Sequence, residues 1–304
     1  MIISLKRMLA QANKKNYAVG AYNINNMEFV QAVVSASEKM NSPAIISTTE
    51  GAIRYAGMPY LKTLVYTAAA HTKIPITFHL DHGRDFTVIK QAIKAGYSSI
   101  MYDGSHLPFK ENVRNTAKVV RWAHKKGVSV EGELGTIGGA EDLVSSREII
   151  YTDPDTAKEF VEKTGVDALA IAIGTSHGAY KFSSTPTLDI ARLKTIKKLT
   201  KLPLVLHGAS EVPQYLVRQA NRYGATLGKA RGVPDAQIRQ AVKHGINKVN
   251  EDTDLRLAFL ASTRKTLVKQ PSVFDPRKIL GPARDYVQKI VEDRIKLLGS
   301  KGKA

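Results

Sequence analysis

Three histidines that lie beside glycines are the side chains of this sequence best suited to hold a metal ion. His82 stands in the run DHG, His177 in SHG and His207 in HGA. Glycines allow the backbone and a ligand to approach closely, and three imidazoles with one open position form a catalytic zinc site. Each histidine alone could equally be a hydrogen-bonded polar residue at a strand end, so the prediction rests on the three together. Because the chain contains no cysteine, any transition metal has to be held by His, Asp and Glu.

Four carboxylates could act beside such a metal. Asp81 directly precedes His82 and could transfer a proton there, or it could form a turn or cap before the helix that follows. Asp103 and Glu133 could be further ligands or could hydrogen-bond to ligands, and salt bridges to the many basic residues are the alternative. Glu141 follows the paired glycines of GTIGGAED. These glycines predict a mobile loop that could bring Glu141 in as an acid or base, with a plain surface loop as the alternative.

Eight short apolar runs are the strands that must position these side chains. They alternate with stretches of helical periodicity, such as residues 26–40, 61–73 and 108–127, which is the pattern of parallel βα units. Eight units in about 250 residues are typical of a TIM barrel, so we expect one α/β domain with the (β/α)8 fold over residues 1–304. A doubly wound open sheet is the alternative, because periodicity does not distinguish it from a closed one. The expected strands are residues 17–24, 43–48, 75–80, 98–103, 128–134, 166–173, 203–207 and 246–250.

Two segments depart from a simple barrel. Residues 208–245 are long for one βα unit and predict two helices separated near GKARGVPD, so that an extra helical insertion over residues 211–233 follows the seventh strand. The tail after Phe274 predicts a long helix as a C-terminal extension. The insertion could serve contacts between subunits.

Polar side chains stand at nearly every expected strand end, where the catalytic groups of a TIM barrel gather. Asn23 and Thr49 end or follow the first two strands, and Asn250 ends the last. Packing alone does not explain this placement after apolar strands. The turns that follow strands six to eight could bind phosphate through backbone N–H groups; they comprise residues 174–178, 207–210 and 249–254. The sequence therefore predicts a phosphorylated substrate at this end of the barrel.

The net charge of +18, from 45 Lys and Arg against 27 Asp and Glu, raises the question of nucleic-acid binding. The basic residues are scattered over helical segments, without an arginine-rich arm or an aromatic platform. A solvated surface, or a field that attracts anionic substrates, is the better interpretation. No run reaches the roughly 18 apolar residues of a membrane span, and basic residues interrupt the N-terminal run that a signal peptide would need. We therefore expect a cytoplasmic protein that binds neither nucleic acid nor membrane.

Five long motifs, in order along nearly the whole chain, resemble those of class II fructose-bisphosphate aldolases. They are HLDHG (79–83), YDGSHLPFKENV (102–113), VSVEGELGTIGG (128–139), DALAIAIGTSHGAYKF (167–182) and PLVLHGAS (203–210). The resemblance implies reversible aldol cleavage of fructose 1,6-bisphosphate to dihydroxyacetone phosphate and glyceraldehyde 3-phosphate, in glycolysis and gluconeogenesis. The reaction would pass through a zinc-stabilised enediolate, with the metal replacing the lysine Schiff base of the other aldolase class.

The resemblance also implies roles for individual residues. The zinc ligands would be His82, His177 and His207, and an alternative or second metal position would use Asp103 and Glu133. Asp81 would exchange a proton with the C4 hydroxyl of the substrate, and Glu141 would move the C3 proton. Substrate contacts would come from Thr49, Gly178, Gly208, Ala209, Ser210, Asn250, Glu251, Asp252, Thr253 and, from a neighbouring subunit, Arg277. The family commonly has a small residue where Glu251 stands, so the role of this side chain is left open.

Tagatose-bisphosphate aldolase, which shares the zinc chemistry but differs in stereochemistry at C4, is the nearest alternative. Asp252 favours fructose bisphosphate, because this position resembles the acidic one of fructose-type enzymes and not the small one of tagatose types. A nucleic-acid-binding or scaffold protein is the alternative from another class, and it would leave the strand-end His and Asp dispensable. Cobalt could replace zinc at the same ligands. The resemblance further implies a monovalent cation site, and we expect a homodimer or homotetramer.

Overall fold

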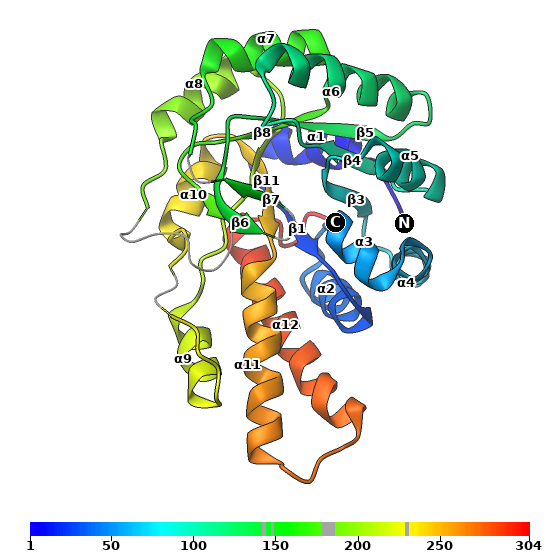
Figure 1. The fold of residues 1–304 in the computed structure, drawn as a ribbon, viewed down its shortest axis with the longest axis vertical. Coiled ribbons are helices and arrows are strands. Elements are labelled where there is room, and N and C mark those ends of the chain that lie inside the picture. Colours follow the sequence, from blue (N-terminus) through cyan, green and yellow to red (C-terminus); the bar gives the residue numbers. More distant parts are fainter. Residues whose placement is uncertain (142–143, 147–148, 178–185, 229–230) are drawn as a thin grey trace.

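Eight parallel strands form a closed barrel in the computed structural model, which describes residues 1–304 except 142–143, 147–148, 178–185 and 229–230 (Figure 1). Closure confirms the (β/α)8 prediction and excludes the open sheet. Each predicted strand overlaps one barrel strand. Around the barrel the strands follow the order β1 (Val19–Asn23), β11 (Ile246–Glu251), β10 (Leu204–Leu206), β8 (Ala168–Ile171), β5 (Ser129–Leu134), β4 (Ser99–Tyr102), β3 (Ile76–Gly83) and β2 (Ala44–Thr49).

Helices surround the barrel and cover its outer face (Figure 1). The helices of the described residues are α1 (Leu5–Lys15), α2 (Met27–Met40), α3 (Glu50–Ala56), α4 (Met58–Ala70), α5 (Phe86–Ala95), α6 (Phe109–His124), α7 (Pro154–Thr164), α8 (Ile190–Thr200), α9 (Gln214–Arg222), α10 (Asp235–Lys243), α11 (Thr253–Lys269) and α12 (Pro276–Leu298). None of them, within the part of the chain that the structure describes, is long and apolar enough to cross a membrane.

Side chains alternate between the barrel interior and the helical layer, as strand geometry requires. On β3, Phe78 and Leu80 pack in the core between strands and helices, whereas His79 and Asp81 make their hydrogen bonds with other strands inside the barrel. Near the amino ends of the strands the barrel interior is filled mainly by apolar side chains. Polar side chains follow toward the carboxyl ends. One end of the barrel is therefore a packed core and the other carries chemistry.

Helix α1 closes the end of the barrel at which the strands begin, called the amino-terminal end below. Its buried residues are Leu5, Met8, Leu9 and Ala12, the spacing of an apolar helical stripe. They form one apolar cluster with interior side chains that include Val19, Ala21, Ile45, Met101, Ala168, Ala170 and Val205. Ser4 begins the helix, because its side chain accepts a hydrogen bond from the N–H of Arg7. Water is thus kept away from the barrel interior on this side.

The two predicted departures from a simple barrel are both present. Helices α9 and α10 follow β10, as the 208–245 segment predicts. Helices α11 and α12 form a hairpin whose connecting loop projects away from the barrel, and α9 lies beside α11 (Figure 1). The second half of this hairpin returns to pack on α2. A small sheet in the order β7 (Val144–Ser146), β6 (Gly138–Glu141), β9 (Ser176–His177) was not predicted.

Lys197 on α8 joins three segments near the amino-terminal end of the barrel. Its Nζ donates to Asn13 Oδ1 (2.6 Å), Leu202 O (2.8 Å) and Asn247 Oδ1 (2.9 Å). Burial lowers the pKa of Lys197 from 10.5 to about 8. The folded protein therefore gives up this proton more readily than the unfolded chain does.

The Lys197→Met variant should change how stability depends on pH. Between pH 8 and 10.5 the unfolded wild-type chain binds more protons at this position than the folded protein, so stability from Lys197 rises with pH. We expect the free energy of unfolding of the wild type, relative to the variant, to increase across that window. Urea unfolding below, within and above the window measures it. A difference that falls as pH rises would contradict the burial of this ammonium.

Candidate metal centre

Asp81 is held at the carboxyl end of β3 by amides from two other strands. Its Oδ2 accepts a hydrogen bond from Asn23 Nδ2 (3.0 Å) on β1, and its Oδ1 accepts one from Asn250 Nδ2 (2.9 Å) on β11. Burial raises the pKa of Asp81, but His82, His207 and the hydrogen bond from Asn23 outweigh it, and the net shift is downward. The side chain is therefore an ionised, oriented carboxylate.

His82 follows Asp81 directly, yet both side chains belong to the same cluster. In a regular strand, consecutive side chains point to opposite faces. Here the pairing of β3 with β4 shifts between Leu80 and Gly83, and His82 adopts a left-handed backbone with φ +46°. A histidine in this region is uncommon, and such strain is typical of functional sites. The irregularity turns His82 toward the site that Asp81 already faces.

Two overlapping groups of side chains could hold a metal ion among the described residues. Asp81, His82 and His207 form one group, and His82, Asp103 and Glu133 form the other; within each, the candidate ligand atoms lie within 4.8 Å of one another. The rings of His82 and His207 have centroids 4.6 Å apart. His82 Nδ1 lies 3.1 Å from Asp103 Oδ2 and 3.7 Å from Glu133 Oε2. The sequence separates these residues by up to 126 positions, from Asp81 to His207, and the barrel brings them together.

The charge around His82 favours a cation. Burial lowers the pKa of His82, but Asp81, Asp103 and Glu133 outweigh it and raise the pKa to about 10. Burial and the neighbouring Asp103 raise the pKa of Glu133 well above its usual range. Glu133 Oε2 is buried and has no hydrogen-bond partner among the residues that the structure describes. Imidazole nitrogens and carboxylate oxygens are ligands of borderline divalent metals, so these residues fit such an ion.

Asp103 also holds His82 in place from the outer side. Arg84 donates to Asp103 Oδ2 through Nε (3.0 Å) and Nη2 (2.7 Å), and Ser105 donates to Oδ1 through its N–H and hydroxyl. Burial raises the pKa of Asp103, but His82 and Arg84 keep it well below its usual range. Glu50 fixes this turn, because its Oε1 accepts from the N–H groups of Arg84 and Asp85, both at 2.8 Å.

The third predicted ligand, His177, is described through its backbone, which lies in β9 and pairs with Gly139 of β6. The preceding residue, Ser176, touches the turn after His207: a Cβ placed on Gly208 would lie 2.6 Å from Ser176 O. The strand that carries His177 therefore packs against the turn that carries His207. Glu141, the predicted loop carboxylate, is described through its backbone at the end of β6. Gly178 lies outside the described residues.

Gly208 should tolerate no side chain. Its φ is +61°, and a Cβ would meet the backbone O and C of Ser176 at 2.6 and 2.7 Å. We expect Gly208→Ala to lower the free energy of unfolding by about 1–3 kcal/mol and to weaken metal binding, because β9 must move. Urea unfolding and competition with a chelator measure the two effects. Gly127→Ala is the matched control, since φ is +69° there but no atom lies within 4 Å; equal losses in both variants would contradict the contact.

The end of β11 leads into the first turn of α11. Asp252 Oδ1 lies 2.7 Å from Arg256 Nε, and the next residue, Thr253, begins the helix. Asp254 accepts hydrogen bonds from the N–H groups of Glu211 (3.0 Å) and Val212 (2.8 Å), which fixes the loop after β10. Ala209 and Ser210, in the same loop, are buried. The predicted substrate contacts from Gly208 to Ser210 and from Asn250 to Thr253 thus lie on the loop after β10 and at the end of β11 leading into α11.

Two predicted substrate contacts have other partners in this structure. Thr49 caps α3, accepting a hydrogen bond from the N–H of Ala52 (3.0 Å). The carboxylate of Glu251 is fully buried and accepts from Arg294 Nε of α12 at 2.7 Å. Glu251 points out of the barrel, because Lys248 and Asn250 on the same strand make their hydrogen bonds inside it. Its side chain therefore joins β11 to α12 in the helical layer.

The family model described as fructose-bisphosphate aldolase class-II matches residues 3–303. The chain belongs to this family. It is 47% identical over 306 residues to a fructose-bisphosphate aldolase of Thermus caldophilus, with all of both chains covered. It is 48% identical to one of Giardia intestinalis, with 100% of this chain and 94% of the relative covered. The crystal structure of the YdjI aldolase from Escherichia coli K12 superposes with a TM-score of 0.83 at 33% identity, covering 100% of each chain.

The sequence did not predict a role for three side chains that contact this centre or lie directly behind it, Arg84, Glu131 and Lys248. Arg84 and Lys248 carried no signal, since single basic residues occur throughout the chain. Glu131 stands two residues before Glu133 on the same predicted strand, and the family resemblance gives a role to Glu133 alone. The alternation along β5 places both carboxylates inside the barrel, Glu133 nearer the carboxyl end and Glu131 below it.

Proposed function

We propose that this chain catalyses reversible cleavage of fructose 1,6-bisphosphate to dihydroxyacetone phosphate and glyceraldehyde 3-phosphate as a zinc-dependent class II aldolase. The observation that carries the proposal is the Asp81 carboxylate, held by two amides beside His82 and His207. An aldol cleavage needs a base at one hydroxyl and an electrophile at the neighbouring ketone. This arrangement offers both in a chain of the aldolase family.

His82, His177 and His207 would hold the zinc, with Glu133 and Asp103 as a second position. A divalent ion in such a site polarises a carbonyl oxygen and so favours loss of the bond beside it. The side chains of Asp81, His82 and His207 are buried. Burial excludes water and strengthens every electrostatic interaction there. Cobalt would suit the same ligands. A monovalent cation remains a prediction from the family resemblance.

Asp81 would remove the proton of the C4 hydroxyl. The C3–C4 bond then breaks, C4 becomes the aldehyde carbon of glyceraldehyde 3-phosphate, and the electron pair stays with the three-carbon fragment. Glu141 would return a proton to C3 and complete dihydroxyacetone phosphate. Asn23 and Asn250 keep the carboxylate of Asp81 aimed, because both of its oxygens accept their amide N–H groups. A positioned acid or base of this kind contributes about 10²–10⁴-fold in rate.

One phosphate of the substrate would bind between the turn after β10 and the start of α11. The turn supplies Gly208, Ala209 and Ser210, and Gly178 would add to it. The first turn of the 17-residue helix α11 supplies N–H groups and the positive end of the helix dipole. Asn250 and Thr253 border this space. Asp252 would recognise the C4 hydroxyl and so favour fructose over tagatose bisphosphate.

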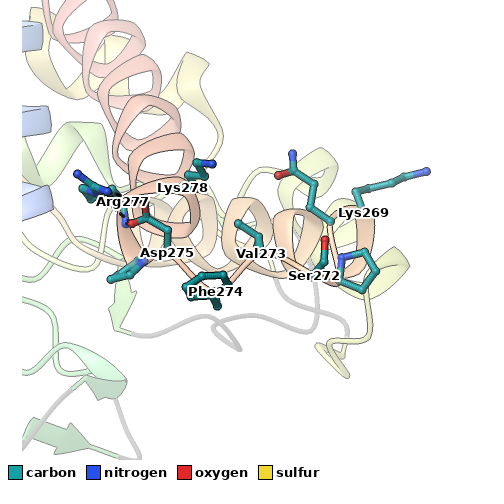
Figure 2. A pocket seen from close by; sticks show the side chains of 10 residues that line it. Lys269, Ser272, Val273, Phe274, Asp275, Arg277 and Lys278 are labelled. Atoms are coloured by element: carbon teal, nitrogen blue, oxygen red, sulfur yellow. Dashed lines mark hydrogen bonds and ion pairs between the residues drawn. The ribbon is translucent and has the colours of Figure 1, made fainter.

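Arg277 would reach the other phosphate from a second subunit. It stands at the start of α12, beside the loop that projects away from the barrel (Figure 1), and its side chain is 89% exposed. The pocket around it, seen in Figure 2, is lined by residues 269–278 and has a volume of about 860 Å³. Asp275 orients the guanidinium through Nε and Nη2. A homodimer or homotetramer would place this arginine at a neighbouring active site.

The Arg277→Ala variant should raise KM for fructose 1,6-bisphosphate by about 10–100-fold, since a charge-assisted hydrogen bond contributes roughly 1.5–3 kcal/mol. Proton exchange at C3 of dihydroxyacetone phosphate should stay unchanged, because that fragment carries only the first phosphate. Steady-state kinetics and isotope exchange measure the two. Arg284→Ala removes a charge from the exposed side of the same helix and serves as the control. If Arg277→Ala weakens cleavage and proton exchange equally, Arg277 does not act at the second phosphate alone.

The deciding experiment compares cleavage of fructose 1,6-bisphosphate and tagatose 1,6-bisphosphate before chelation, after it, and with zinc added back. We expect cleavage of the fructose substrate that disappears with the chelator and returns with zinc. Cleavage that resists chelation would refute the zinc mechanism. Preference for tagatose bisphosphate would replace the substrate and overturn the role of Asp252. The cytoplasm, which the sequence predicts as the location, suits these phosphorylated substrates.

A further inference from the structure

Below His207, the barrel interior holds a chain of polar side chains that the proposed reaction does not use. Lys248 Nζ on β11 donates to Glu131 Oε2 on β5 at 2.7 Å, and Glu131 Oε1 lies 2.8 Å from His207 Nε2. Lys248 Nζ also lies 3.3 Å from His79 Nε2, and His79 Nδ1 lies 2.8 Å from Ser99 Oγ. All five residues have an exposed fraction of 0%. Four strands thus contribute to one buried network.

With Lys248 as an ammonium and Glu131 as a carboxylate, the contacts of this network fix which ring nitrogen of His79 and of His207 faces an acceptor. An ammonium group only donates, so Lys248 donates to both Glu131 Oε2 and His79 Nε2. His79 therefore carries its proton on Nδ1 and donates it to Ser99. A carboxylate only accepts, so Glu131 Oε1 receives the Nε2–H of His207. A histidine that binds a metal has to be neutral, and in a neutral His207 ring the lone pair is then on Nδ1, which lies 4.0 Å from Asp81 Oδ1, on the side of the cluster with His82.

We propose that Glu131 and Lys248 are positioning residues that fix His207 as an Nδ1 ligand of the metal. Glu131 selects the tautomer and the ring orientation, as carboxylates behind metal-binding histidines do. Lys248 holds Glu131 turned toward the ring, because its Nζ binds Oε2 at 2.7 Å and leaves Oε1 facing His207. The inference rests on the proposed role of His207 as a metal ligand.

Lys248 has a second conceivable role, since a lysine on a barrel strand is where other aldolases form a Schiff base. The geometry opposes it. The amine is fully buried and bound to a carboxylate at 2.7 Å, on the side of Glu131 away from His207. Reduction with borohydride in the presence of dihydroxyacetone phosphate should leave Lys248 unmodified, and a substrate adduct at this residue would overturn the proposal.

The Glu131→Gln variant tests the proton arrangement directly. Lys248 can only donate, so it selects the amide oxygen of the new side chain and turns the NH2 group toward His207. That NH2 group donates to Nε2, which moves the ring proton to Nδ1 and blocks the ligand atom. In Glu131→Gln/Lys248→Met the lysine is gone, and the amide oxygen can turn back to His207. The double variant should therefore restore the original tautomer.

The readout is the ring ¹⁵N spectrum of the metal-free protein with labelled histidine, where His207→Gln assigns the signal. At a pH where the ring is neutral, we expect Nε2–H in the wild type, Nδ1–H in Glu131→Gln and Nε2–H again in the double variant. Zinc affinity, measured by competition with a chelator, should fall by about 10–100-fold in Glu131→Gln and recover in the double variant. Lys197→Met, which removes a partly buried lysine hydrogen-bonded at the other end of the barrel, is the control and should change neither.

A wild-type ring that carries its proton on Nδ1 would overturn the proposal while zinc-dependent cleavage stands. An unchanged tautomer and unchanged zinc affinity in Glu131→Gln would do the same. If zinc leaves the His207 signals of the wild type unmoved, His207 is no ligand, and both this inference and the proposed metal site fail. Circular dichroism identifies variants that do not fold, and the wild-type spectrum decides the tautomer without any of them.

Discussion

The Asp81→Asn variant is expected to lose about 10²–10⁴-fold in kcat for cleavage, the contribution of a positioned acid or base. The substituted side chain has nearly the same shape and keeps one oxygen for Asn23 or Asn250, so the site should remain folded. It cannot take up the proton of the C4 hydroxyl. Steady-state kinetics with zinc content measured in the same samples tests this.

Isotope exchange separates loss of the base from loss of the site. Exchange of the C3 proton of dihydroxyacetone phosphate with solvent involves no C4 hydroxyl, so Asp81→Asn should keep most of it. Asp85→Asn is the control, because Asp85 caps α5 through the N–H of Thr87 and asparagine caps equally well. If Asp81→Asn loses exchange and cleavage together, or retains full cleavage, Asp81 is not the base at C4.

The Arg294→Met variant is expected to lower the free energy of unfolding by about 3–5 kcal/mol, the cost of leaving a buried charge without its partner. Arg294 on α12 donates to Glu251 Oε1 of β11 at 2.7 Å and to Asp235 Oδ1 of α10 at 2.8 Å. Glu251 is fully buried, so water cannot replace the guanidinium. Burial lowers the pKa of Arg294, but Glu251, Asp254 and Asp235 outweigh it and raise the pKa. Urea unfolding measures the loss of stability.

Two further variants locate the origin of this loss. Arg284→Met removes an arginine whose partner, Asp285, lies on the surface, and should cost within about 0.5 kcal/mol. Glu251→Gln/Arg294→Met removes the buried charge as well and should be more stable than Arg294→Met alone. If the double variant is no more stable, packing of the arginine stem explains the loss and the ion pair does not.

Much of the fold was predictable because its signals are local. Strands and helices follow from the period of apolar residues, and the eight predicted strands coincide with barrel strands. The two helices after β10 and the long last helix were predicted in the same way. Closure was not local, since it depends on β1 pairing with β11 at the other end of the chain. The small sheet β7-β6-β9 was missed because its strands are two to four residues long.

The sequence by itself determined which residue types stand at the strand ends, and with the barrel pattern this placed His82, His207, Asp81, Asp103 and Glu133 near one point. It could not determine which way each side chain points. Strand alternation would send Asp81 and His82 to opposite faces, and only the left-handed backbone at His82 turns both to one site. Alternation also sends Glu251 outward to Arg294, away from the barrel interior.

Contacts between distant strands were decided by the tertiary structure alone. Glu131 and Lys248 are 117 positions apart, and neither has a neighbour in sequence that indicates the other. Strand order and register bring them to one level of the barrel beneath His207. The physical reason is that periodicity depends on neighbouring residues, whereas the proton arrangement of a buried network depends on which donors and acceptors the closed barrel brings together.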